Sequence, residues 1–258
     1  MKFPRNNMKK SLWKRALGLF LMVCAIGGVN ANQSEIAAAS KRLFGLQVTA
    51  VRESLIAGFY GINTSPSEIG PRFFMDQSLT VHGNTFTGYS HNAGNRRSQD
   101  LYPQEAQELF LSMLTALKKE RLPTYKFGDG SREVLLFTAY DCPSCRALEK
   151  NLLQQAKQLN VTVYLVPLAL RYEVDASSRI PVQNLVCATD REAAWQNLIL
   201  KRAIPPAMRC PEQADDYAYL ARAFPVKVPQ TVPWAITLAS GKIHQTVSRD
   251  FAEIFGGR

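Results

Sequence analysis

The sequence has little cysteine and little histidine, and it lacks internal repeats and low-complexity tracts. Of its 258 residues, five are Cys and three are His, while 46% are apolar and 20% are charged. A chain of this length can bury a core without disulfide bonds to hold it. The composition therefore excludes an intrinsically disordered protein and a disulfide-rich miniprotein. It predicts one large domain or two modest ones.

The first 15 residues lack acidic side chains, and the apolar run that follows them is short. Residues 1–15 carry six Lys and Arg side chains, and residues 16–29 form an uncharged, largely apolar run of 14. A membrane span needs about 20 apolar residues, which disfavours a membrane anchor. A basic start, a short apolar run and a small-residue site at Val29-Asn30-Ala31 are typical of a secretory signal peptide. We therefore expect residues 1–31 to be a signal peptide that is cleaved after Ala31.

Much of the positive charge belongs to this segment. The whole sequence has a formal net charge of +10, which taken alone would suggest a nucleic-acid partner. Six of its 31 basic residues and none of its 21 acidic residues lie in residues 1–31, so the mature chain carries only +4. Cys24 leaves with the same segment. We therefore expect no nucleic acid as a partner, and four cysteines in an oxidising compartment.

The next segment, up to about residue 100, contains no cysteine. Apolar residues at helical spacing between Ser34 and Gly45 predict a short amphipathic helix, with Ser34 as its N-cap and Gly45 as its end. Runs of β-branched and aromatic residues then predict strands over 48–52, 55–63, 72–75 and 79–89. We interpret residues 32–100 as an N-terminal α+β domain with a small antiparallel sheet.

Residues 101–122 predict one helix between the two halves of the chain. Pro103 suits the first helical position, and apolar residues follow on a continuous stripe. Basic side chains at Lys118, Lys119 and Arg121 suit a helix C-terminus. We place the domain boundary at about residue 122. The helix could be a rod between two domains or a packed core helix, and its sequence favours neither.

Residues 123–258 alternate between strand and helix patterns, which predicts an α/β domain. A buried strand is expected over 133–140, a helix from residue 142, a second strand over 161–166, a helix capped by Thr189 and Glu192, a hairpin from 234–238 and 242–246, and a last helix over 248–255.

The strongest chemical signal is the motif Cys142-Pro143-Ser144-Cys145, which lies where a buried strand meets the start of a helix. In this context a CxxC motif predicts redox chemistry. The free N–H groups and dipole of the helix N-terminus should stabilise Cys142 as a thiolate, the nucleophilic form. Cys145, one turn deeper, should be the resolving cysteine, which attacks a mixed disulfide on Cys142.

The remaining cysteines and the histidines do not favour a metal site. A structural zinc ion needs four ligands, whereas Cys187 and Cys210 stand singly and His82, His91 and His244 are remote in sequence. We expect no metal and no other cofactor. Cys187 and Cys210 suit a permanent disulfide that closes a loop of about two dozen residues and stabilises the fold by roughly 3 kcal/mol. A second redox relay is the alternative reading of this pair.

Taken together, these features resemble the DsbC/DsbG family of periplasmic thiol:disulfide interchange proteins over nearly the whole mature chain. The segment 137–145 (FTAYDCPSC) carries the resemblance most clearly. Residues 186–188 and 207–210 are similar to the family's second disulfide, and Thr231-Val232-Pro233 occupies the place of its cis-proline loop. The resemblance implies a cystatin-like N-terminal dimerisation module, a linker helix over 101–122, and a thioredoxin-like catalytic domain with a helical insertion over 123–258.

The resemblance also implies function and partners. Members of this family form homodimers through their N-terminal domains, act on misfolded proteins that contain disulfides, and are kept reduced by a DsbD-type membrane protein. Thr231, Val232 and Pro233 would bind an extended client segment through free backbone groups, as an added strand. Pro233, rather than Pro229, is expected to be cis.

Two departures from the family pattern leave the direction of catalysis open. Val232 stands where isomerases of this type usually have Thr, and in this respect is similar to the DsbA oxidases. The Pro-Ser dipeptide of the CxxC motif also differs from the Gly-Tyr of DsbC. The leading expectation is an isomerase or reductase; the alternatives are a dithiol oxidase and a client-holding chaperone with secondary redox activity.

Overall fold

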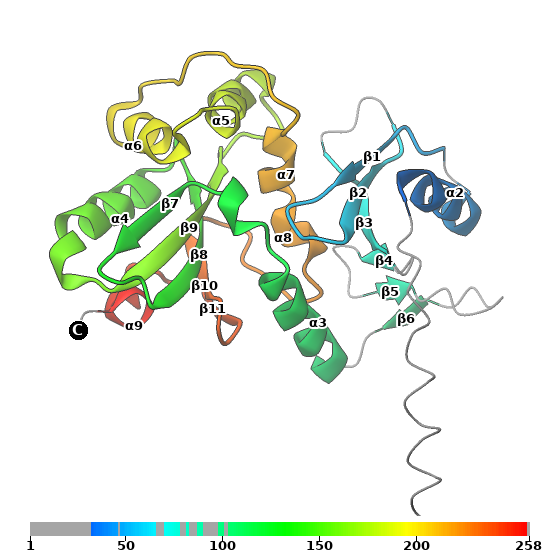
Figure 1. The fold of residues 1–258 in the computed structure, drawn as a ribbon, viewed down its shortest axis with the longest axis horizontal. Coiled ribbons are helices and arrows are strands. Elements are labelled where there is room, and N and C mark those ends of the chain that lie inside the picture. The colour runs from blue at the N-terminus through cyan, green and yellow to red at the C-terminus, as the bar shows by residue number, and fades with distance from the viewer. Residues whose placement is uncertain are drawn as a thin grey trace, which may run out of the picture.

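The computed structural model describes residues 32–45, 47–65, 70–77, 81–82, 87–89, 98–100 and 103–256. The expected signal peptide, its cleavage after Ala31 and His91 lie outside the described residues. Two units lie side by side (Figure 1): an N-terminal α+β unit with helix α2 and an antiparallel sheet, and a C-terminal α/β unit with a second sheet. Within the described part of the chain, no helix has both the length and the apolar character that a membrane crossing requires.

The N-terminal unit is a helix packed on an antiparallel sheet. Helix α2 spans Gln33–Phe44, and the strands, which pair in chain order, are β1 (Ala50–Glu53), β2 (Phe59–Asn63), β3 (Phe73–Asp76), β4 (Val81–His82), β5 (Thr87–Tyr89) and β6 (Ser98–Asp100). Asn32, not Ser34, caps α2, because its side chain accepts the N–H groups of Ser34 and Glu35. Strand β6 was not expected, because its Ser-Gln-Asp sequence lacks a strand pattern.

Helix α3 (Pro103–Thr115) ends before the basic cluster that was expected to close it, and a short 3-10 turn, η1 (Lys119–Arg121), follows. The physical reason is a long-range contact. Leu117 forms an antiparallel bridge with Ile56, and backbone hydrogen bonds of 2.8 and 2.9 Å flank the bridge. The chain therefore leaves the helix to pair with the N-terminal unit.

The inner face of α3 is packed rather than free. Phe110, Met113 and Leu114 are buried in one core together with Leu55 of the N-terminal unit and Phe224 of the C-terminal unit. Phe110 meets Phe224 edge to face, with ring centroids 5.1 Å apart. Of the two readings of this helix, the packed one describes its contacts; the domain boundaries themselves stay a prediction.

The C-terminal unit is built on a mixed sheet in the order β11-β10-β8-β9-β7. Its strands are β7 (Thr124–Phe127), β8 (Arg132–Ala139), β9 (Val161–Leu168), β10 (Trp234–Thr237) and β11 (Lys242–His244). Its helices are α4 (Pro143–Gln154), α5 (Ile180–Val186), α6 (Arg191–Lys201), α7 (Ala214–Ala218), α8 (Leu220–Ala223) and α9 (Phe251–Phe255), with 3-10 turns η2 (Ala156–Gln158) and η3 (Ala176–Arg179). Strands β8 and β9 are parallel and joined through α4, whereas the other pairs are antiparallel.

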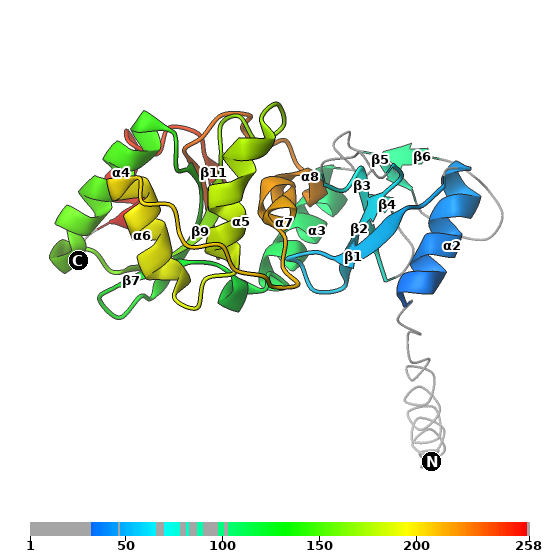
Figure 2. The ribbon, with the colours of Figure 1, turned by 90° about the horizontal axis from the view of Figure 1, so that it is seen from above.

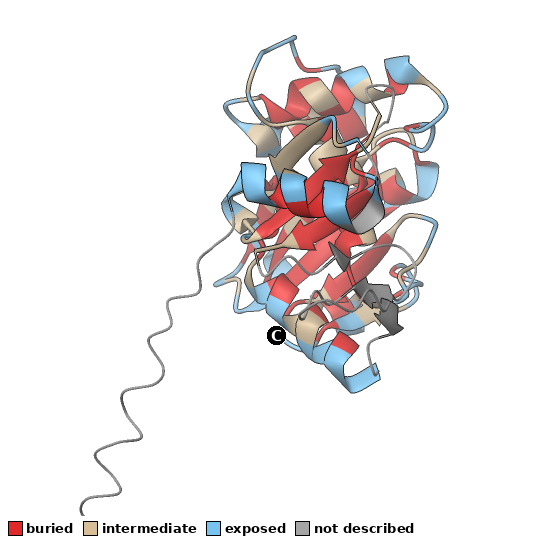
Figure 3. Cartoon of the chain, turned by 90° about the vertical axis from the view of Figure 1, so that its right-hand side faces the viewer, coloured by how far each residue is buried: buried red, intermediate tan, exposed pale blue. Residues whose placement is uncertain are grey.

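Strand β8 is buried on both faces. Successive side chains point to opposite sides of a sheet, and those of β8 enter two different cores. Val134 and Leu136 pack in the core beneath α4, α6 and α9, while Leu135 and Phe137 pack in the core shared with α3, α7 and α8. Figure 3 shows the buried residues running along the strands and the inner faces of the helices. One departure from expectation concerns α6, whose cap is Asp190 rather than Thr189, since its side chain accepts the N–H of Ala193.

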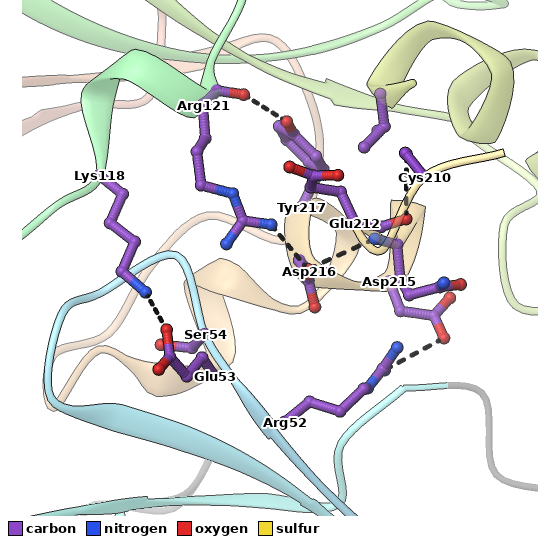
Figure 4. Close-up of polar contacts among 12 residues, drawn as sticks. Arg52, Glu53, Ser54, Lys118, Arg121, Cys210, Glu212, Asp215, Asp216 and Tyr217 are labelled. Atoms are coloured by element: carbon purple, nitrogen blue, oxygen red, sulfur yellow. Dashed lines mark hydrogen bonds and ion pairs between the residues drawn. The ribbon is translucent and has the colours of Figure 1, made fainter. Parts of the chain in front are cut away.

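Helices α7, α8 and α3 lie between the two sheets, as both ribbon views show (Figure 2). Polar contacts cross this interface (Figure 4). Arg52 pairs with Asp215 at 3.6 Å, Arg121 pairs with Asp216 at 3.4 Å, and the hydroxyl of Tyr217 donates to the Arg121 carbonyl oxygen at 2.5 Å. The N-terminal unit therefore rests directly on helices α7 and α8 of the C-terminal unit.

Candidate active site

The CxxC motif lies at the junction of β8 and α4. Cys142 is the N-cap of α4 and Pro143 its first residue, a position where the missing N–H costs nothing and the fixed φ suits a helix. The turn before it is held in place at Asp141, whose carboxylate accepts the N–H of Leu170 at 2.9 Å. The strand, the turn and the helix start thus position the motif as the sequence predicts.

The sulfur of Cys142 faces hydrogen-bonding groups of its own helix turn. It accepts the backbone N–H of Cys145 at 3.2 Å and shares a hydrogen bond of 3.1 Å with the Ser144 hydroxyl. The backbone N–H of Cys145 donates to this sulfur at the helix N-terminus, whereas in the contact with Ser144 either atom can be the donor. Cys142 and Cys145 are free thiols in this structure.

Cys145 is enclosed, with none of its surface exposed, against 3% for Cys142. Burial raises the pKa of the Cys145 thiol far above its usual range, and the neighbouring Cys142 raises it further. The backbone amide of Ala139 and the hydroxyl of Thr138 oppose these effects and lower the pKa in part. Cys145 is therefore a thiol at neutral pH, and it needs a proton acceptor before it can attack.

The loop before β10 meets Cys142. The Val232–Pro233 peptide bond is cis, and the carbonyl oxygen of Val232 lies 3.9 Å from the Cys142 sulfur. Thr231, in the same loop, is exposed. The sequence-predicted residues of the CxxC motif and of this loop thus come together in space.

A cavity of about 390 Å³ adjoins this loop, and its walls combine apolar side chains with the charged side chains of Glu173 and Arg222. Residues that line it include Leu170, Tyr172, Val174, Tyr219, Val232 and Trp234. Leu170 and Val174, which line it, leave 56% and 79% of their surface exposed. Val232 belongs both to the cavity wall and to the contact with Cys142, so the two features are continuous.

Cys187 and Cys210 form a disulfide with Cα atoms 5.4 Å apart. The bond joins the end of α5 to the irregular segment before α7, and the carbonyl oxygen of Glu212 in that segment accepts the side chain of Gln183 at 3.0 Å. Cys187 and Cys210 thus belong to the helical segment between β9 and β10 and not to the strand–helix junction of the CxxC motif. Over the described residues, no group of three or more His, Cys, Asp or Glu side chains is arranged to hold a metal ion.

Two buried polar residues near the motif were not predicted, Thr138 and Glu149. Both are fully buried, and a hydrogen bond of 2.6 Å joins them. A signal for Glu149 was present in the sequence, because it falls on the apolar face of α4 that Leu148 and Leu152 define. A carboxyl group in the middle of such a face is buried unless the helix is turned away from the core.

Comparison with known proteins gives the class of this site. Residues 120–247 match the protein family described as Thioredoxin-like domain, so the C-terminal unit is a thioredoxin-like domain. The chain is 25% identical over 126 residues to the probable thiol:disulfide interchange protein DsbC of Bordetella pertussis, a match that covers 49% of this chain and 42% of that protein. It is 22% identical over 207 residues to the thiol:disulfide interchange protein DsbC of Salmonella typhimurium, covering 80% of this chain and 81% of that protein.

The match therefore spans less than half the length of the Bordetella relative. A solved disulfide interchange protein from Neisseria gonorrhoeae aligns with a TM-score of 0.41 and 20% identity, over 54% of this chain and 99% of that chain. The sequence comparisons confirm the resemblance that the motifs carry: the chain is similar to the DsbC-type thiol:disulfide interchange proteins.

Proposed function

We propose that the chain is a periplasmic thiol:disulfide interchange protein that isomerises or reduces incorrect disulfides in secreted proteins. The observation that carries this proposal is the position of the Cys142 sulfur, 3.2 Å from the Cys145 amide and 3.9 Å from the Val232 carbonyl oxygen. A thiolate at a helix N-terminus, beside free backbone on a neighbouring loop, suits attack on a disulfide in an extended segment.

The exchange takes two steps. The Cys142 thiolate attacks one sulfur of a client disulfide, which forms a mixed disulfide and releases the other client sulfur as a thiolate. Isomerisation follows when another client thiolate attacks the mixed disulfide and regenerates Cys142. Reduction follows when Cys145 attacks Cys142 instead, which releases the reduced client and leaves a Cys142–Cys145 disulfide. A DsbD-type membrane reductant restores the dithiol.

Client binding falls to the loop of Thr231, Val232 and Pro233 and to the cavity beside it. An extended client segment pairs with the loop backbone, and its apolar side chains enter the cavity, where Leu170 and Val174 offer exposed apolar surface. The clients are misfolded proteins, because these expose the apolar segments that folded proteins bury.

The N-terminal part supplies the dimer in this proposal. Residues 32–100 form a cystatin-like dimerisation module, residues 101–122 link it to the catalytic domain at 123–258, and residues 1–31 direct export to the periplasm. The α-helix on an antiparallel sheet supports the module, and the family resemblance supports the homodimer. Analytical ultracentrifugation of the exported chain tests it: a dimer mass is expected, and a monomer at micromolar concentration would refute the dimer.

A second candidate function is dithiol oxidation. It is favoured by Val232 and by the Pro-Ser dipeptide, which differ from the isomerase pattern. The equilibrium of the Cys142–Cys145 pair against glutathione separates the two, since a strongly oxidising pair belongs to an oxidase and a more reducing pair to an isomerase or reductase.

Reactivation of scrambled ribonuclease tests the main proposal. With a trace of reductant, the wild type should restore ribonuclease activity, and Cys142→Ser should not. Absence of reactivation together with fast oxidation of reduced ribonuclease would overturn the isomerase assignment in favour of the oxidase.

A further inference from the structure

Two tyrosines in the wall of the cavity beside Val232 are also tied to the N-terminal unit. Tyr172 lies in the turn after β9, and Tyr219 lies between α7 and α8. Their rings meet edge to face with centroids 6.2 Å apart, and both side chains are buried. A binding site keeps its shape only when the residues that line it are locked by their own contacts. The groups that hold these two rings therefore bear on what the cavity can bind.

Tyr172 is held by a carboxylate that the N-terminal unit also engages. The Tyr172 hydroxyl donates to Oδ1 of Asp215 on α7 at 2.5 Å. Arg52 of β1 pairs with Oδ2 of the same carboxylate at 3.6 Å (Figure 4). Burial and the hydrogen bond to Asp215 raise the pKa of Tyr172, so its hydroxyl keeps its proton and donates at neutral pH. Because each oxygen of Asp215 has its own partner, Arg52 fixes the orientation of the carboxylate that Tyr172 needs.

Tyr219 is held by the backbone of the N-terminal unit. Gly70 comes so close that a Cβ atom added to it would lie 2.1 Å from the Tyr219 ring. The guanidinium of Arg222 lies 4.0 Å from the centroid of the same ring and pairs with Glu173, and both charged residues line the cavity. Tyr219 therefore contacts the N-terminal unit and a charged pair in the cavity wall at the same time.

We propose that Arg52 is a positioning residue for client binding: through Asp215 it holds Tyr172 in the wall of a cavity that takes an aromatic side chain of the client. The inference rests on the proposed exchange function and deepens it. Aromatic rings favour edge-to-face and offset contacts with other rings, and the cavity wall offers the rings of Tyr172, Tyr219 and Trp234. The N-terminal unit thus shapes the client site of its own chain, a role separate from dimerisation.

The test measures how fast Cys142 forms an adduct with two matched peptides. Each peptide carries one cysteine as a mixed disulfide with thionitrobenzoate, and the residue beside that cysteine is Phe in one peptide and Ser in the other. The Cys142 thiolate attacks the peptide sulfur, the bond to thionitrobenzoate breaks, and the coloured thiolate leaves. A Cys145→Ser background prevents resolution of the adduct. The rate against peptide concentration gives a half-saturating concentration and a limiting rate.

In the background protein, the Phe peptide should saturate at a lower concentration than the Ser peptide. Arg52→Met should raise the half-saturating concentration of the Phe peptide by about threefold to tenfold, the size of one lost hydrogen bond. Its limiting rate and the values for the Ser peptide should stay the same. Tyr172→Phe, which removes the donor hydroxyl, should also weaken binding of the Phe peptide. The two changes act through Asp215, so together they should cost no more than the larger one alone.

Lys118→Met is the matched control, because it removes another basic partner of β1. Lys118 pairs with Glu53, the neighbour of Arg52, at 2.7 Å, and neither member of this pair lines the cavity. Both peptides should keep their background values in this variant.

Four results would overturn the inference and leave the exchange intact: equal saturation of the two peptides in the background protein, no loss or an equal loss for both peptides in Arg52→Met, a selective loss of the same size in Lys118→Met, or additive losses in the double variant. Failure of the background protein to form an adduct with either peptide would overturn the exchange itself.

A measurement with the interface intact covers the case in which its variants fold poorly. Coupling between two sites is reciprocal, so a filled cavity should stabilise the contact that shapes it. Amide hydrogen exchange in β1 and α7 should be slower in the Phe-peptide adduct than in the Ser-peptide adduct. Equal exchange in the two adducts would overturn the inference.

Discussion

The sulfur of Cys142 lies 3.9 Å from the carbonyl oxygen of Val232, although 90 residues separate them in the chain. The pairing of β8 with β10 brings them together, since Trp234 stands opposite Phe137 in this register, with the two rings stacked 3.8 Å apart. The helix that follows β8 starts at Cys142, and the loop that precedes β10 ends at Pro233. The pairing of β8 with β10 therefore brings the CxxC motif and the loop of Val232 and Pro233 together.

The packing of the two units predicts a large cost for Gly70→Ala. Gly70 has φ +76°, and a Cβ atom there would lie 2.1 Å from the ring of Tyr219. The left-handed backbone alone costs an L-residue about 1–2 kcal/mol. Gly45→Ala is the matched control, because Gly45 has φ +64° with nothing within 4 Å of the added atom. Thermal unfolding should show a clearly larger loss for Gly70→Ala, and equal losses would contradict the observed contact.

The shared core predicts that the two units unfold together. Phe110 of α3 is 1% exposed and packs in the core that also holds Leu55 and Phe224. Phe110→Ala should lower the free energy of unfolding by about 3–5 kcal/mol. Glu108→Ala, an exposed change on the same helix, should have little effect. Denaturation monitored by circular dichroism should show one transition in each case, and two separate transitions in the wild type would contradict a shared core.

We expect the Cys187–Cys210 disulfide to stabilise the fold and to take no part in catalysis. It closes a loop with a sequence separation of 23, and replacing both Cys187 and Cys210 by Ser should cost roughly 3 kcal/mol. Urea denaturation measures this loss. The folded variant should still form mixed disulfides through Cys142. Loss of this reactivity in a folded variant would assign the pair to a redox relay instead.

The buried carboxyl group of Glu149 predicts that the free energy of unfolding depends on pH. The pKa of Glu149 is about 7 in the folded chain, against an ordinary value of 4.5. Between these values the folded state holds a proton that the unfolded state has lost, so this group's contribution to stability falls as pH rises from about 4.5 to 7. The total is of the order of 3 kcal/mol, at about 1.4 kcal/mol per pH unit. Urea denaturation of the wild type and Glu149→Gln should differ by this slope, and parallel pH curves would refute the raised pKa.

Local patterns predicted the strand–helix junction that positions Cys142, because the buried strand over 133–140 and the helix from residue 142 each have a clear sequence pattern. The position of Val232 beside Cys142 came from the family resemblance, since strand pairing across 90 residues leaves no local signal. The early end of α3 was missed for the same reason: its cause is the bridge between Leu117 and Ile56. The burial of Glu149 was not predicted, because a charged residue is expected to be exposed even where it falls on the apolar face of a helix.

Trapping of a client on the protein tests the central claim most directly. The Cys145→Ser variant, which cannot resolve a mixed disulfide intramolecularly, is mixed with scrambled ribonuclease, and the products are mapped by mass spectrometry. The account predicts a covalent adduct at Cys142 that dithiothreitol releases, and no adduct in the double variant Cys142→Ser, Cys145→Ser. An equal yield in the double variant, or no adduct at Cys142, would contradict the account.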